Sequence, residues 1–137
     1  MRVSEPRAGF TLVELLIVLA VVGILAAVAI PRMGPARERA HYATISSDFR
    51  NLGAAQERYF QGDMSYSQDV AALDFQPTQG VDVEVTEATP SGWAAVGRHD
   101  ALDETKGCVI YLGDAVAPPL PNGDPHTRGS GVVQCTF

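Results

Sequence analysis

The chain has 137 residues, which is enough for one modest domain and too short for two. It carries 10 basic and 16 acidic residues, for a formal net charge of −6. This acidity argues against a phosphate-binding surface and against nucleic acid as the main direct ligand. Hydrophobic residues make up 46% of the chain, an ordinary average, but they are concentrated near its start.

The segment from Phe10 to Ile30 is almost continuously apolar, and only Thr11 and Glu14 are conspicuously polar. As an α-helix rising ~1.5 Å per residue, it would span about 31 Å, the thickness of a bilayer's hydrocarbon core. Two alternatives are a buried core helix and a secretory signal peptide. The segment lacks the polar face that meets water in a core helix, and it is long for a signal peptide. The pattern therefore favours a membrane-spanning helix.

Glu14 stands near the beginning of this helix, where a charge is costly in lipid. At the bilayer centre the cost of a charged group is ~2.5–3.5 kcal/mol or more. Near the end of the span the carboxylate could reach the headgroups as an interfacial residue. Alternatively, it meets a positive partner inside a protein assembly, where the second charge makes burial tolerable.

The charges that flank the apolar segment do not determine its orientation, because arginines lie on both sides of it. Two cysteines, Cys108 and Cys135, could form a disulfide if the fold brings them together; otherwise they are unpaired buried thiols. Disulfides persist outside the cytoplasm, so the pair favours an extracytoplasmic C-terminal body. A bridge would close a loop rich in proline and glycine and stabilise the fold by roughly 3–4 kcal/mol.

Pro31 ends the apolar segment, and we expect a kink or local unwinding over Ala27–Ile30 because proline removes a backbone donor and clashes with the preceding turn. Gly34-Pro35 is a second expected break. Beyond it, apolar residues recur at spacings of three and four, which predicts an amphipathic helix that ends near Gly62. The apolar face comprises Ile45, Phe49, Leu52, Ala55 and Tyr59, and the residues expected in solvent are Arg37, Glu38, Arg50, Glu57 and Arg58.

The rest of the chain predicts an antiparallel sheet. Residues 61–73 are expected to form a loop with one short helical turn, followed by strands near 81–85, 93–98, 108–112 and 132–137. Short strands separated by turn signals suggest a meander packed on the helix. The predicted fold class is therefore α+β: a long N-terminal helix, with its first half in the membrane, and a small antiparallel sheet.

The sequence offers little support for catalysis or metal binding. His41, His99 and His126 are scattered without zinc-ligand spacing, and no serine lies in a nucleophile-elbow context. His99-Asp100 resembles half of a catalytic triad, but adjacent residues rarely face one site. Asn122-Gly123-Asp124 is expected to be a tight turn rather than part of a calcium loop. We expect no catalytic residue, no metal and no cofactor, and so no enzyme.

The stretch GFTLVELLIVLAVVGILAAVAIP, from Gly9 to Pro31, resembles the N-terminal signature of type IV pilins and of type II secretion pseudopilins. The resemblance implies that a prepilin peptidase cuts between Gly9 and Phe10 and methylates Phe10. It also implies that Glu14 meets the N-terminal amine of a neighbouring subunit. Gly23 and Pro31 match the family's intramembrane glycine and helix-distorting proline.

The resemblance implies four regions: a leader (1–9), a transmembrane and polymerisation helix (10–31), its amphipathic continuation (32–61) and a head with strands and a disulfide-bounded loop (62–137). The head would lie in the periplasm of a bacterium while the single span sits in inner-membrane lipid. The implied partners are further copies of the chain in a helical filament, the peptidase, the inner-membrane assembly machinery and minor pilins.

The implied function is that of a structural pilin in a surface filament for adhesion, twitching motility or DNA uptake. A C-terminal cysteine pair is typical of type IV pilins, whereas major pseudopilins more often have a calcium site in that region. Two alternatives stay open: a pseudopilin, and a membrane-tethered binding domain that never polymerises.

Overall fold

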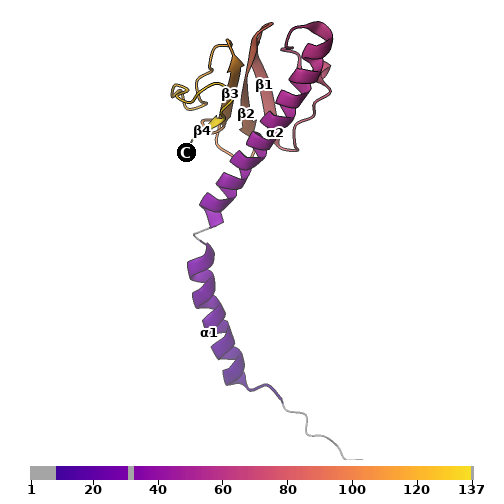
Figure 1. Cartoon of the computed structure of the whole chain (residues 1–137). Helices are drawn as coiled ribbons and strands as arrows, with labels where there is room; N and C mark the ends of the chain where they lie inside the picture. Colours follow the sequence, from indigo (N-terminus) through magenta and orange to yellow (C-terminus); the bar gives the residue numbers. More distant parts are fainter. Residues whose placement is uncertain (1–8, 31–32, 137) are drawn as a thin grey trace, which may run out of the picture. The chain divides into compact units, whose positions relative to one another are not determined.

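The computed structural model describes residues 9–30 and 33–136 (Figure 1). The chain divides after Arg37 into two compact units. The first unit contains helix α1 (Leu12–Ala29) and the first residues of helix α2 (Met33–Asp63). The second contains the rest of α2, the 3₁₀ helix η2 (Val70–Leu73) and the strands β1 (Val81–Ala88), β2 (Gly92–His99), β3 (Cys108–Gly113) and β4 (Gln134–Cys135). The predicted α+β fold, with an N-terminal helical region and an antiparallel sheet, is confirmed.

Helix α1 stays regular almost to the end of the apolar segment. It continues through Ala29, and the N–H of Ile30, which is still in the right-handed helical region, donates to the carbonyl of Ala26. The distortion predicted over Ala27–Ile30 is therefore wrong for most of that stretch, because the local backbone bonds are made. Pro31 itself lies outside the described residues.

The predicted helix break at Gly34-Pro35 is also wrong. Gly34 and Pro35 lie within the first turn of the helix as described, where the N–H groups have no intrahelical acceptor and proline therefore loses no hydrogen bond. The predicted end near Gly62 is confirmed, because the helix ends at the next residue, Asp63. The left-handed residue that follows is Met64, with φ of 54°, and its N–H donates to the carbonyl of Phe60 at 2.9 Å.

The sheet is an antiparallel meander, as predicted. Its strand order is β1-β2-β3-β4, so β1 and β4 form its two edges (Figure 1). Strand β4 is shorter than the sequence suggested, because only Gln134 and Cys135 pair with β3. The turn between residues 120 and 124 is tight, as predicted: the N–H of Gly123, at φ +89°, donates to the carbonyl of Leu120.

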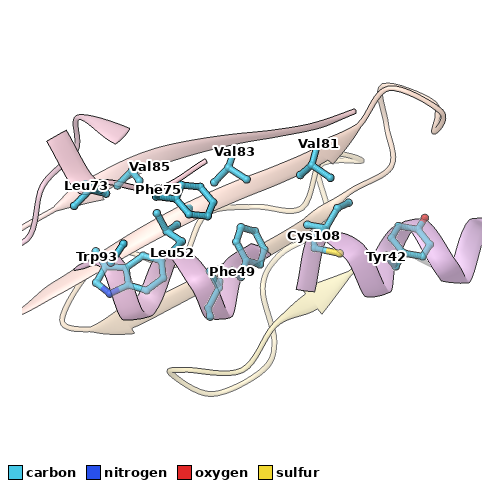
Figure 2. Close-up of a cluster of buried hydrophobic side chains, with 14 residues drawn as sticks. Tyr42, Phe49, Leu52, Leu73, Phe75, Val81, Val83, Val85, Trp93 and Cys108 are labelled. Carbon is cyan, nitrogen blue, oxygen red and sulfur yellow. The ribbon is translucent and has the colours of Figure 1, made fainter. Parts of the chain in front are cut away.

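The main core lies between one face of α2 and one face of the sheet (Figure 2). The predicted helix stripe supplies it, and Ile45, Phe49 and Leu52 are at most 1% exposed. Alternate residues of β1 point to this core, as the period of two predicts. Trp93, one of the side chains labelled in Figure 2, is 2% exposed and packs between helix and sheet.

A second, smaller cluster covers part of the other face of the sheet. It consists of Val96 from β2, Val109 from β3 and Leu120 from the proline-rich segment after β3. The two central strands are therefore buried on both faces, which explains why β2 has a continuous run of buried residues where β1 alternates.

Gly97 allows α2 to lie close to the sheet. A Cβ atom at this position would lie 2.6 Å from Cγ2 of Ile45 and 2.9 Å from Cζ of Phe49, both closer than real Cβ contacts. Gly53, on the facing helix, is different: a Cβ there would meet the Trp93 ring at 3.6 Å, an ordinary van der Waals contact.

Two buried polar side chains on α2 hold the segment that connects the helix to the sheet. Asp48, 2% exposed, accepts hydrogen bonds from the backbone N–H and the hydroxyl of Thr78, both at 2.8 Å. The amide of Gln56, 0% exposed, donates to the carbonyl of Ser67 and accepts from its N–H. These bonds satisfy groups that would otherwise be costly to bury, and they fix the path of the connection.

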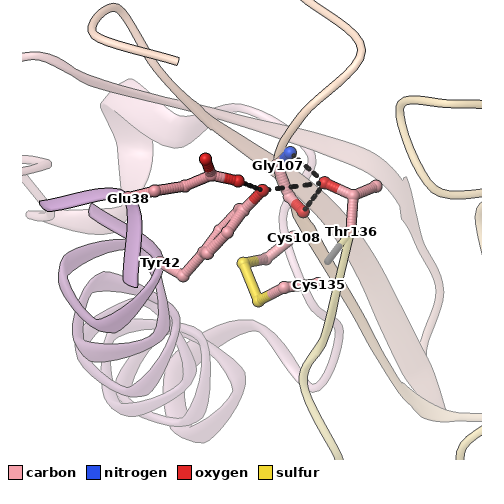
Figure 3. Close-up of a disulfide and its surroundings, with 6 residues drawn as sticks. All are labelled: Glu38, Tyr42, Gly107, Cys108, Cys135 and Thr136. Carbon is pink, nitrogen blue, oxygen red and sulfur yellow. Dashed lines mark hydrogen bonds between the residues drawn. A yellow bond between two sulfur atoms is a disulfide. The ribbon is translucent and has the colours of Figure 1, made fainter. Parts of the chain in front are cut away.

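A disulfide joins Cys108 of β3 to Cys135 of β4, which are directly opposite each other in the sheet and 27 residues apart in sequence (Figure 3). The next residue, Thr136, is held at the same place. Its hydroxyl accepts from the N–H of Gly107 at 3.0 Å and lies 3.2 Å from the phenolic oxygen of Tyr42 on α2 (Figure 3). Thr136 is therefore tied to both the sheet and the helix.

Glu38, expected in solvent, instead joins this network. It accepts from Tyr42 at 3.1 Å and forms an ion pair with Lys106 at 3.0 Å. The hydrogen bond from Lys106 lowers the pKa of Glu38, and the same bond raises the pKa of Lys106. Burial, the largest cause, raises the pKa of Tyr42. Because the pKa of Glu38 is lowered on folding, its contribution to stability is lost as pH falls through that lowered value.

We expect Gly97→Ala and Gly53→Ala to change stability in opposite directions. The first forces a methyl group against Ile45 and Phe49 and should lower the free energy of unfolding by about 1–3 kcal/mol. The second replaces a helix-interior glycine and should raise it by about 0.5–1 kcal/mol. Thermal unfolding of the two variants measures both, and equal effects would contradict this account of the helix–sheet contact.

Removing the disulfide by Cys108→Ser with Cys135→Ser should destabilise the head by roughly 3–4 kcal/mol. The reason is that the unfolded chain regains the conformational entropy of the loop between the two cysteines, which are 27 residues apart. Chemical denaturation of oxidised and variant protein measures the difference. Reduction of the unmodified protein is the matched control. A loss below about 1 kcal/mol in both would show that the hydrogen bonds of Thr136 hold this edge without the covalent link.

Candidate assembly site

The start of α1 combines a helix cap with the only charged side chain between residues 9 and 30. Thr11 is the N-cap residue, and its hydroxyl accepts from the N–H of Glu14 at 3.3 Å. Oε2 of Glu14 in turn accepts from the N–H of Thr11 at 2.9 Å and from its hydroxyl at 2.8 Å. This reciprocal arrangement is a capping box, which satisfies two backbone donors that the helix leaves free.

This capping role was not predicted from the sequence, although the signal for it is present. Thr11-Leu12-Val13-Glu14 has the Thr-x-x-Glu spacing that marks a capping box before an apolar run. The box orients the carboxylate of Glu14 without neutralising it, because Thr11 supplies only neutral donors. Among the described residues, Glu14 makes no ion pair. The negative charge is therefore available to an external cation.

The remainder of α1 is an apolar surface that its own chain does not bury. None of its residues is buried, and its large aliphatic side chains range from 50% exposed at Val21 to 73% at Leu12. By length and composition, the helix is suitable for crossing a membrane. Small residues interrupt its surface. They are Ala20, Gly23, Ala26, Ala27 and Ala29.

The other predicted site residues are placed as follows. Gly9 and Phe10 precede the helix, and the Phe10 side chain is 84% exposed. A Cβ at Gly23 would meet nothing within 4 Å, so no intrachain contact explains a glycine there. Pro31 lies outside the described residues. Cys108 and Cys135 belong to the second unit and form the disulfide described above.

The histidines are less scattered in space than in sequence. Nδ1 of His41 on α2 lies 3.1 Å from Nε2 of His99 at the end of β2, and Nδ1 of His99 lies 3.0 Å from Oδ1 of Asp100. Nδ1 of His99 is also 3.1 Å from the backbone nitrogen of Ala101, whose N–H it accepts when that ring nitrogen carries no proton. The adjacent His99 and Asp100 side chains thus contact each other, and the expectation that they form no catalytic site stays a prediction. Within residues 9–30 and 33–136, no three His, Cys, Asp or Glu side chains are placed to hold a metal ion.

Comparison with known proteins agrees with the N-terminal geometry. A family model described as the prokaryotic N-terminal methylation motif matches residues 6–30. The chain is 45% identical over 95 residues to the type IV wide pilus major component PilA4 of Thermus thermophilus, an alignment that covers 66% of this chain and 72% of that protein.

Two further relatives are a second pilin and a protein of a secretion system. The type IV major pilin protein PilA of Myxococcus xanthus is 40% identical over 83 residues, which cover 58% of this chain but only 38% of that protein. The type II secretion system core protein G of Pseudomonas aeruginosa is 31% identical over 75 residues, or 53% of each chain. Identity is thus higher to the two pilins than to the secretion protein, and the pilins are structural proteins. Together with the apolar helix, its Glu14 cap and the sheet-bearing head, these matches show that the chain belongs to the type IV pilin family.

Proposed function

We propose that this chain is a filament subunit that a prepilin peptidase cuts between Gly9 and Phe10 and methylates at Phe10, and that then polymerises through α1. The observation that carries the proposal is the start of α1, where a capped but unneutralised carboxylate begins a helix that is otherwise apolar and exposed. Before assembly the helix would sit in inner-membrane lipid. Assembly would require the inner-membrane machinery and minor pilins.

The apolar surface of α1 supports both stages. In lipid it needs no polar face, because the backbone groups in the helix interior are satisfied within the helix. In a filament the same side chains would pack against sister helices, away from water. Association inside lipid depends on close van der Waals contact, and the alanines and Gly23 would allow helices to approach.

Glu14 links processing to assembly. Cutting after Gly9 creates an ammonium group on Phe10, and the carboxylate of Glu14 stands four positions further along the chain. A buried carboxylate is tolerated when an opposite charge and hydrogen bonds satisfy it. We infer that the amine of one copy pairs with Glu14 of a neighbour, while Thr11 keeps the carboxylate oriented in both the free and the assembled subunit.

The head supports placement outside the cytoplasm and in a pilus. Its disulfide is of the kind that persists in an oxidising compartment. It also bounds the long segment between β3 and β4, as expected for a pilin. A pseudopilus is the second candidate, because the secretion protein matches the chain. Filaments seen outside the cell would favour the pilus, and a secretion defect without filaments would favour the pseudopilus.

The mature protein should begin at Phe10, and its N-terminal peptide should be heavier by one methyl group than the unmodified sequence. Mass spectrometry of protein isolated from the native membrane or from filaments checks both. A Gly9→Leu variant is the control, since blocking the cut should leave the leader attached and prevent filament formation. A working native protein that retains residues 1–9 would contradict the proposal.

Glu14→Gln and Thr11→Val separate the charge of Glu14 from its capping role. Glutamine can replace glutamate in a capping box, so Glu14→Gln keeps the cap and removes the charge. We expect it to remain in the membrane but to reduce filament recovery at least about tenfold, as expected when one partner of a buried charge pair is lost.

Thr11→Val is the matched control, because it removes the cap and keeps the carboxylate. It should cost the helix about 1 kcal/mol and leave most filament assembly intact. Both variants are scored by filament recovery relative to membrane-bound subunit. If Thr11→Val abolished filaments and Glu14→Gln did not, capping rather than charge pairing would be the role of Glu14.

A further inference from the structure

A small pocket opens where α2 meets the β4 edge of the sheet. Its volume is about 280 Å³. Helix α2 contributes one side of it, and the segment around β4 contributes the other, including one half of the disulfide. Its lining residues are Arg39, Tyr42, Ala43, Ser46, Arg128, Val133 and Cys135.

The pocket is positively charged although the protein is acidic. Two of its lining residues are arginines and none is a carboxylate, in a chain with 16 acidic and 10 basic residues. Within the part of the chain that the structure describes, neither Arg39 nor Arg128 forms an ion pair or a side-chain hydrogen bond. Tyr42, Val133 and Cys135 add apolar surface between the two arginines. A carboxylate on an aliphatic stem matches this combination better than a bare, fully hydrated anion does.

A second surface, where β1 begins and β2 ends, presents the complementary charge. Four carboxylates, those of Asp82, Asp100, Asp103 and Glu104, line an open pocket of about 430 Å³ beside the start of β1, together with Arg98 and His99. The side chains of Asp82 and Glu104 are exposed and have no hydrogen-bond or ion-pair partner among residues 9–30 and 33–136. The acidic and the basic pocket have no lining residue in common, so one copy offers two different patches.

We propose that the Arg39–Arg128 pocket of one copy receives an acidic side chain from the Asp82–Glu104 surface of a second copy. The inference rests on the proposed function, since it assigns to the filament a contact between the globular heads of two neighbouring subunits. Two different patches on one molecule make a heterologous contact, which propagates into a ring or a helical fibre rather than closing as a dimer. This is the symmetry that a filament subunit requires.

Cross-linking in intact filaments tests the contact directly. The full-length Ser46→Cys/Glu104→Cys variant places one thiol at each pocket, while the two native cysteines stay in their disulfide. A short bifunctional thiol reagent should produce a ladder of covalent multimers, because each copy carries both halves of the contact. Ala54→Cys/Glu104→Cys is the matched control, with an exposed α2 residue that does not line either pocket, and it should give no ladder.

Charge reversal tests the electrostatics. Arg39→Glu/Arg128→Glu should lower filament recovery about tenfold, since like charges would then face each other across the contact. Adding Asp82→Arg/Glu104→Arg to the same chain reverses both surfaces and should restore recovery. Arg50→Glu/Arg58→Glu, on exposed arginines of the same helix, is the control and should leave recovery near the parental level. Thermal unfolding of each detergent-extracted full chain shows that the head remains folded.

The possible outcomes separate the two proposals. Filaments that form normally but give no ladder, or that are unaffected by the Arg39/Arg128 reversal, would overturn this inference and leave the proposed function standing. Only dimers from the double-cysteine variant would indicate a symmetric contact and would also overturn it. Binding of inorganic phosphate to the pocket, with filament recovery unchanged by the reversal, would identify a small-anion site instead. A parental chain that forms no filaments would overturn both proposals.

Discussion

A helix without a polar side cannot remain in water, and the rest of this protein is organised around that constraint. Helix α1 exposes every one of its large aliphatic side chains, so something outside the chain must cover them. Lipid can do so for a single subunit, and sister helices can do so for an assembled one. The same surface therefore suits both the membrane and the filament, and the transfer between them exchanges one apolar environment for another.

In the function proposed above, the one charged group in that helix makes the exchange selective. A carboxylate is acceptable near the membrane surface, but inside a helical bundle it needs a cation. The capping box shows how the side chain can be held ready: Thr11 donates to Glu14 and leaves its charge uncompensated. Local helix chemistry and assembly chemistry thus share one residue. They are separable in principle, because a capping box requires a hydrogen-bonding side chain but not a charged one.

The head has a small core, and several specific interactions hold its helix and strands together. Its helix lies directly against the sheet at Gly97, where no side chain intervenes. Asp48 and Gln56 use buried hydrogen bonds to hold the connection between helix and sheet. The disulfide and the hydroxyl of Thr136 hold the last strand, which has too few backbone pairs to be stable alone. A head held at several independent points can present its two charged surfaces in fixed positions.

Much of this protein could be predicted from patterns that depend only on near neighbours in sequence. Each of these patterns arises because one helix or strand turns a regular set of side chains to one environment. The examples are the apolar segment, the helix stripe through Ile45, Phe49 and Leu52, and the alternation in β1. The sequence alone was therefore sufficient for the α+β class, the antiparallel meander and the N-terminal motif typical of the family. The break expected at Gly34-Pro35 was wrong, because a helix tolerates such residues in its first turn.

Only the tertiary structure decided which distant residues meet. In the sequence, Asp48 and Glu38 resemble ordinary solvated residues of a helix. In the structure, Asp48 is hydrogen-bonded to Thr78 and Glu38 is paired with Lys106. Arg39 and Arg128 are far apart along an acidic chain, and nothing in their separate contexts indicates one pocket. Pairings of this kind depend on how the chain folds back in three dimensions, whereas periodicity reports only the burial of one face. The membrane helix could thus be read directly from the sequence, and the charged surfaces of the head could not.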